Sequence, residues 1–128
     1  MGTPVINKRP VNLDISTIKL PITATVSILH RVSGVALVFA VAVVLGLLGC
    51  SLRSPESFSQ VQSLLAIVPM KLLLWAILAA FIYHLLAGVR HLIMDAGVGE
   101  TLEGGKRGAT IVVVLAVICI LLAGVLIW

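Results

Sequence analysis

The sequence predicts an all-α membrane protein, a bundle of three transmembrane helices with its N-terminus in the cytoplasm. Of its 128 residues, 60% are apolar and 11% are charged, and the mean hydropathy is +1.21. Soluble domains carry about 25% charged residues, so this composition excludes a water-soluble globule, a disordered tail and a nucleic-acid-binding protein. The net charge of +4 is therefore interpreted as a sign of membrane topology.

The predicted spans are stretches of sequence without a charged residue. They cover residues 32–52, 72–89 and 108–128, with lengths of 21, 18 and 21 residues. A helix that rises about 1.5 Å per residue needs about 20 apolar residues to cross a hydrocarbon core about 30 Å thick. The runs show no alternation of apolar and polar residues, so helices are favoured over the strands of a membrane barrel. With their flanks, the spans are expected at about 22–52, 69–93 and 108–128.

The basic residues are divided unequally between the two ends of the predicted bundle. Seven lie before the first span or between the second and the third: Lys8, Arg9, Lys19, Arg31, Arg90, Lys106 and Arg107. Arg53 and Lys71 lie at the other end. Because cytoplasmic flanks carry an excess of Lys and Arg, residues 1–20 are predicted to be a cytoplasmic segment, with the C-terminus outside. This segment lacks the apolar stretch of a cleavable signal peptide, so we expect it to belong to the mature protein.

The connections between the spans differ in character. Ser54 and Pro55 are typical of a helix N-terminus, and the apolar residues that follow recur at helical spacing: Phe58, Val61 and Leu65. An interfacial helix ending near Pro69 is therefore predicted between the first two spans. The inner connection, residues 95–107, is predicted to be a flexible turn because it contains four glycines: Gly97, Gly99, Gly104 and Gly105.

His84 is the most informative polar residue, because an ionisable side chain inside a membrane is costly unless it is paired or used. It precedes Arg90 by six residues, which places it about 9 Å inside the cytoplasmic boundary. Its imidazole could donate to a carbonyl of a neighbouring helix, relay protons or bind a haem iron. Gly88 leaves room one turn away, and Arg31 and His30 could neutralise haem propionates from the cytoplasmic side. This asymmetry favours haem.

The same arithmetic predicts that one chain does not supply both axial ligands of such a haem. His30 and His91 are expected near the inner boundary, at a different depth from His84, whereas two ligands of one iron must lie at nearly the same depth. The second ligand is therefore expected from another membrane subunit or a second copy of this chain. His91 and Asp95 are four residues apart on one helix face and could pair with each other.

Ser27, His30 and Arg31 form a second candidate site at the inner start of the first span. Their spacing of three and four residues places them on one face of a helix. A hydroxyl and a guanidinium one turn apart suit a quinone carbonyl, because Arg stabilises a developing oxyanion and Ser forms a hydrogen bond to it. The alternative is headgroup contact, in which Arg31 reaches a lipid phosphate and Ser27 bonds back to the helix.

Two segments carry rare polar residues at fixed spacing in an apolar context. The first consists of Arg9-Pro10 and, further on, the run SILHRVS at residues 27–33; the second is HLLAGVRHLIMDAG at residues 84–97. They resemble the RP, SxxHRxS and HxxxGxRHxxxDxG signatures of the cytochrome b membrane-anchor subunit of succinate dehydrogenase, respiratory complex II. The three-span layout resembles that family over the whole chain, which implies that residues 1–128 are a single membrane-anchor domain.

The resemblance implies a role for each polar residue of the two segments. His84 is implied to be the axial ligand of a haem b iron, paired with a histidine of a second small membrane-anchor subunit that shares the haem. Ser27 and Arg31 are implied to bind ubiquinone, and His30 and Arg31 to contact the haem propionates.

At the level of the whole protein, the resemblance implies a haem b-binding anchor subunit of succinate:quinone oxidoreductase in the bacterial inner membrane. Such a subunit holds the iron-sulfur and flavoprotein subunits and forms part of the ubiquinone-reduction site, while the flavin and iron-sulfur chemistry stays in those partners. The alternatives are the anchor of a quinol:fumarate reductase and a membrane adaptor without haem. A small transporter is disfavoured because none of the three charge-free runs contains a carboxylate.

Overall fold

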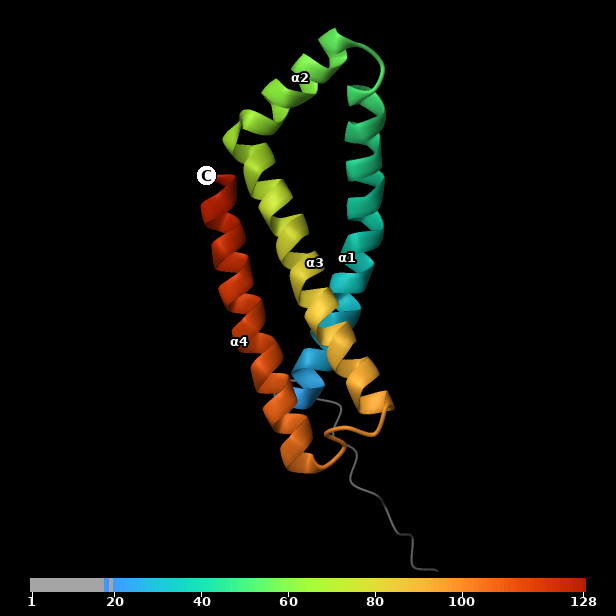
Figure 1. The fold of residues 1–128 in the computed structure, drawn as a ribbon, viewed down its shortest axis with the longest axis vertical. Coiled ribbons are helices and arrows are strands. Elements are labelled where there is room, and N and C mark those ends of the chain that lie inside the picture. The colour runs from blue at the N-terminus through green and yellow to red at the C-terminus, as the bar shows by residue number, and fades with distance from the viewer. Residues whose placement is uncertain (1–17, 19) are drawn as a thin grey trace, which may run out of the picture.

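The computed structural model describes Ile18 and residues 20–128, and this part of the chain is helical without a strand. Its elements, in order, are α1 (Ile22–Ser51), α2 (Pro55–Ala66), α3 (Val68–Asp95) and α4 (Leu102–Ile127) (Figure 1). The helices α1, α3 and α4 are long and apolar enough to cross a membrane. The predicted class, an all-α membrane bundle, is confirmed. Lys8, Arg9, Pro10 and Lys19 lie outside the described residues.

The three long helices run lengthwise beside one another (Figure 1). α1 and α3 approach each other in the lower part of this view and separate above, where α2 bridges their ends, and α4 lies along α3. We call the end where α1 begins and where α3 turns into α4 the basic end, because Arg90, Lys106 and Arg107 lie there. The opposite end is called the α2 end.

α1 begins ten residues before the charge-free run that predicted it. Pro21 precedes the first helical residue, Ile22, and with its fixed φ of −65° it is suited to this position. The helix has 30 residues, about 45 Å at 1.5 Å per residue. Ser27, His30 and Arg31 are therefore part of a regular helix, between one and three turns from its start.

The predicted interfacial helix is confirmed as α2. The Ser54 hydroxyl accepts a hydrogen bond from the Ser57 backbone N–H at 3.1 Å, and Pro55 occupies the first helical position. None of its residues is buried. The helix ends at Ala66 instead of Pro69, because the extended Ile67 separates it from α3 and Pro69 lies in the first turn of α3.

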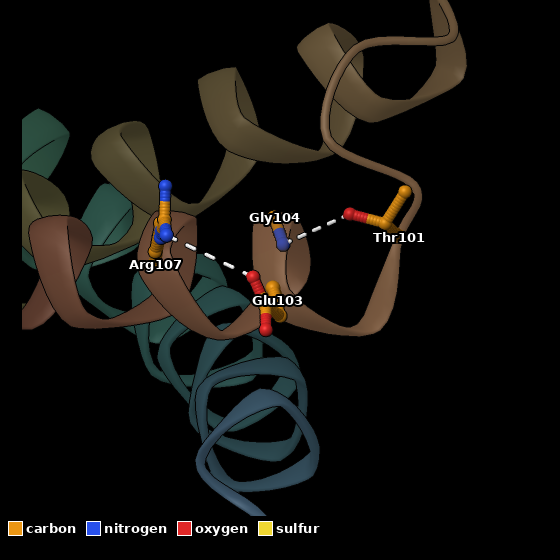
Figure 2. Close-up of polar contacts among 4 residues, drawn as sticks. All are labelled: Thr101, Glu103, Gly104 and Arg107. Carbon is orange, nitrogen blue, oxygen red and sulfur yellow. Dashed lines mark hydrogen bonds and ion pairs between the residues drawn. The ribbon is translucent and has the colours of Figure 1, made fainter.

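The turn between α3 and α4 is shorter than predicted. Gly97 and Gly99 have φ values of +84° and +81°, in the left-handed region that favours glycine. The prediction that the turn continues to residue 107 is wrong, because Thr101 starts α4 by accepting a hydrogen bond from the Gly104 N–H at 3.1 Å (Figure 2). One turn into the helix, Arg107 and Glu103 form an exposed ion pair at 3.7 Å.

Small residues form the contacts between the long helices. The buried core is made mostly of alanines and valines: Val26, Ala40, Ala87, Ala109, Val112, Ala116 and Ala123. Toward the α2 end, the Trp75 indole N–H donates to the Ile120 carbonyl at 2.9 Å, and a Cβ on Gly124 would lie 3.3 Å from that nitrogen. Close helix contact through small residues is the usual packing mode in membranes, where lipid is as apolar as leucine.

Candidate functional site

Three polar residues of the two sequence motifs, His30, Ser33 and His84, meet where α1 and α3 approach each other. The His84 Nδ1 is 3.1 Å from the backbone carbonyl oxygen of His30 and 3.1 Å from the Ser33 hydroxyl oxygen. The Ser33 hydroxyl itself donates to the His30 carbonyl at 2.8 Å. α1 therefore holds one edge of the His84 ring by two contacts from neighbouring turns.

This arrangement defines which nitrogen of His84 carries the proton. A carbonyl oxygen only accepts hydrogen bonds, and the Ser33 proton is already directed to the same carbonyl, so Nδ1 of His84 must be the donor. The neutral imidazole then has an unprotonated Nε2 with a free lone pair. Imidazoles that bind metals show this pattern, in which the other ring N–H donates to a carbonyl and so fixes the orientation of the ligand.

One face of the His84 ring is covered by His30. The two rings are stacked, with centroids 4.2 Å apart and planes inclined by 17°. A Cβ placed on Gly34 would come within 3.0 Å of the His84 Cε1 atom, so this glycine gives the ring its place against α1. The His84 side chain is therefore confined by His30 on one face, by Gly34 near Cε1 and by the two contacts of Nδ1.

The stacking corrects the predicted depths of the histidines. His30 was predicted at the boundary and His84 about 9 Å deeper, yet their rings are in contact. The error arises because the charge of Arg31 was taken to mark the membrane boundary, whereas α1 and α3 pack so that His30 and His84 lie side by side. His91 also joins the group, with its ring centroid 5.1 Å from that of His30 and a tilt of 50°.

The predicted pairing of His91 with Asp95 is not found. Asp95 is exposed and makes no ion pair among the described residues, and the His91 ring is directed to His30 instead. The space above Gly88, predicted to make room for a macrocycle or a helix, contains the His30 ring, whose Nε2 would lie 3.4 Å from a Cβ there. That Nε2 is buried without a hydrogen-bond partner in the described part of the chain.

His30, His84 and His91 are called the histidine cluster below. Ser27 and Arg31 lie beside it on α1. Ser27 is half-buried and Arg31 is exposed. Both were predicted to share one helix face with His30, but the side chains differ in their surroundings. The His30 ring contacts α3. Arg31 borders an open, apolar cavity of about 390 Å³, which is also lined by Val32, Val35 and Ala36. The Arg31 side chain is therefore accessible on the surface of α1.

Besides the bond from Trp75 to Ile120, two polar contacts between helices were not predicted from the sequence. The Tyr83 hydroxyl donates to the Val26 carbonyl at 2.9 Å, joining α3 to α1 next to His84. The Arg90 guanidinium, interpreted above as a cation of the inner flank, is only 8% exposed and donates through Nη2 to the Gly105 carbonyl of α4 at 3.1 Å. The Gly105 and Gly108 pair was the available signal, because two small residues one turn apart allow a long side chain to lie across a helix.

Fold and site together define a small multi-pass membrane protein with a cluster of histidines between two of its spans. The sequence matches the family described as succinate dehydrogenase/fumarate reductase transmembrane subunit over residues 6–123. The chain belongs to this family, which confirms the resemblance drawn from the two motifs and makes it a multi-pass protein of a bacterial inner membrane.

Several relatives support this membership along nearly the whole chain. The succinate dehydrogenase cytochrome b556 subunit of Coxiella burnetii is 43% identical over 122 residues, which cover 94% of this chain and 98% of the relative. The subunit of the same name from Rickettsia felis is 37% identical, with coverage of 97% and 94%. That of Paracoccus denitrificans is 33% identical, with coverage of 88% and 90%.

Proposed function

We propose that this chain is the haem b-binding anchor subunit of a succinate:quinone oxidoreductase and contributes part of its ubiquinone-reduction site. The observation that carries the proposal is the tethering of His84, whose Nδ1–H is directed to the His30 carbonyl and the Ser33 hydroxyl. This leaves Nε2 as the iron ligand. The printed names of the relatives, cytochrome b556 subunits of succinate dehydrogenase, support the same assignment.

The residues around His84 fit a haem. No group of three or more His, Cys, Asp or Glu side chains gathers around a metal position within the described residues, and a haem iron needs one ligand from this chain because the macrocycle supplies four nitrogens. The buried Nε2 of His30 is without a partner there, and a propionate would provide one. Arg31, the next residue, adds a cation for the propionates. When bound, haem b supplies a one-electron store close to the quinone site.

The stacking geometry supports a second subunit as the source of the other axial ligand. If His30 and His84 both held one haem, the haem would have to lie between their rings. The rings of His30 and His84 instead lie face to face with centroids 4.2 Å apart, so no macrocycle fits between them. We infer that a second small anchor subunit provides the partner histidine and shares the haem.

Arg31 and Ser27 are proposed to bind the quinone. The exposed Arg31 guanidinium can donate hydrogen bonds to a quinone carbonyl oxygen, where negative charge develops on reduction. Ser27, one turn earlier on α1, can orient that carbonyl or pass a proton to it. The open cavity beside Arg31 has apolar walls, which suit a quinone ring once a partner subunit closes the site.

The distribution of charge supports an orientation for this chain in the membrane. We propose that the basic end faces the cytoplasm, since Arg90, Lys106 and Arg107 lie there and Arg53 and Lys71 lie toward the α2 end. The iron-sulfur and flavoprotein subunits then dock on the same side as Arg31. Succinate oxidation takes place in the flavoprotein, and this chain makes no bond to succinate.

The purified complex tests this assignment directly. A reduced-minus-oxidised spectrum of the detergent-solubilised complex should show a b-type haem, and mass spectrometry should identify a flavoprotein, an iron-sulfur subunit and a second small hydrophobic subunit beside this chain. A complex of these subunits without haem would contradict the haem assignment and leave a structural anchor. Sustained fumarate reduction by quinol, with little succinate oxidation, would favour the fumarate reductase alternative.

Replacing Gly34 with alanine should lower the haem content of the complex. The added Cβ would lie 3.0 Å from the His84 Cε1 atom, and the ring has little freedom to move because Nδ1 is tethered. Overpacking of this kind costs about 1–3 kcal/mol. Gly46→Ala is the matched control on the same helix, since nothing lies within 4 Å of its Cβ position. Equal haem content in both variants would show that the ring is not confined at this point.

A further inference from the structure

A second polar site lies on the other side of α3 from His84, in a groove between α3 and α4 at the basic end. The groove has a volume of about 390 Å³. Its walls are almost entirely apolar and include Leu86, Val89, Ile93, Ile111 and Leu115. Arg90 and Arg107 also line it, and no residue of the histidine cluster does. One cavity thus has two arginine residues in an otherwise apolar lining.

The charge of Arg90 is buried without a counter-ion. The residue is 8% exposed, and its Nε is buried and has no hydrogen-bond partner among residues 18 and 20–128. The contact found for its guanidinium, to the neutral Gly105 carbonyl at 3.1 Å, leaves the positive charge uncompensated. A buried charge without a partner of opposite sign is strongly destabilising. An anion next to Arg90 would remove this cost.

Arg107 is available to the same anion. It lies one helical turn beyond Glu103, and their ion pair at 3.7 Å is weak because both side chains are more than four-fifths exposed. Between Arg107 and Leu115 the α4 wall of the groove rises eight residues, about 12 Å. This is close to one leaflet of a hydrocarbon core about 30 Å thick.

We propose that this groove binds an anionic phospholipid, with its phosphate between Arg90 and Arg107 and one acyl chain along the walls formed by α3 and α4. A lipid satisfies both halves of the site, whereas free phosphate would leave the apolar walls uncovered. The site lies where a membrane protein of this topology meets the headgroups of a leaflet, and basic pockets between transmembrane helices are known to attract anionic headgroups. The bound lipid would contact both helices and so stabilise the packing of α3 against α4.

The whole complex, purified in detergent, provides the test. Native mass spectrometry counts the phospholipids retained per complex, and the midpoint of thermal denaturation is measured with added phosphatidylglycerol, phosphatidylcholine or inorganic phosphate. The wild type should retain an anionic phospholipid, and phosphatidylglycerol should raise its midpoint. Phosphatidylcholine and inorganic phosphate should not.

Two substitutions and one control make the test specific. Arg107→Gln and Arg90→Gln should each weaken retention about fivefold, the contribution of one basic residue to anionic-lipid binding. Lys106→Gln removes the same charge from the neighbouring exposed position, which does not line the groove, and should behave like the wild type. If Arg90→Gln fails to assemble, Arg107→Gln alone decides, because its side chain is exposed and its loss should not unfold the bundle.

Three results would overturn the proposal. The first is equal lipid retention in Arg107→Gln and Lys106→Gln. The second is stabilisation of the wild type by inorganic phosphate to the same extent as by phosphatidylglycerol. The third is a carboxylate of a partner subunit paired with Arg90 in the assembled complex. None of them bears on the haem assignment, which is read from the spectrum.

Discussion

The complex with His84→Ala is expected to lose its b-type haem spectrum. The Nδ1 atom of His84 is fixed by α1, and its Nε2 is the proposed iron ligand, so alanine removes the proposed ligand and the tether together. We expect complete loss of the haem or a spectrum changed to that of an iron with one axial ligand missing. An unchanged spectrum would eliminate His84 as a ligand.

His91→Ala is the matched control, because it removes an imidazole from the same helix and the same cluster. Its ring approaches that of His30 at 5.1 Å, and within the described part of the chain it makes no hydrogen bond that would fix it as a ligand. The variant should therefore keep the haem spectrum. Assembly of both variants is checked by co-purification of the other subunits and by succinate oxidation with an artificial dye, which does not involve the membrane subunits. Loss of haem in both variants would indicate a disrupted bundle instead of a lost ligand.

The second large effect is expected for Arg31→Ala, which should lower quinone reduction about 100-fold, the typical cost of one donor to a developing oxyanion. Ser27→Ala should lower it less, about fivefold, since a single neutral hydrogen bond contributes about 1 kcal/mol. Dye-linked succinate oxidation should stay at the wild-type level in both variants. The measurement is the ratio of the two activities in one preparation.

Two further variants separate the quinone site from a general role of charge. Arg53→Ala removes an exposed arginine near the α2 end and should leave the ratio unchanged. Arg31→Lys keeps the charge but not the planar fork of donors. It should remain impaired if Arg31 binds a carbonyl, and should recover if Arg31 only contacts lipid phosphate. Equal loss of both activities in Arg31→Ala would point to failed assembly and contradict the quinone assignment.

The error in the predicted depth of His30 shows where reasoning from charges fails. Arg31 was taken to mark the end of the hydrophobic span, because charged side chains usually lie at the membrane boundary. The helix nevertheless begins at Ile22, and an arginine inside it can reach toward the boundary along its aliphatic stem. An arginine in the sequence therefore indicates where its guanidinium lies, and it does not give the depth of its backbone in the membrane. The same limit applies to Arg90, whose charge sits against α4.

The sequence by itself determined the three spans, the short helix after Ser54 and the two histidine-containing motifs. These features depend on apolar length, capping residues and spacing along one helix, all of which are local along the chain. The tertiary structure alone decided which side chains meet across helices. The tether of His84 to Ser33, its stacking on His30 and the burial of Arg90 against Gly105 join residues 51, 54 and 15 positions apart. Such contacts depend on how α1, α3 and α4 cross. Small residues allow the helices to come close, but the spacing of residues within one helix does not determine which residues of another helix they meet.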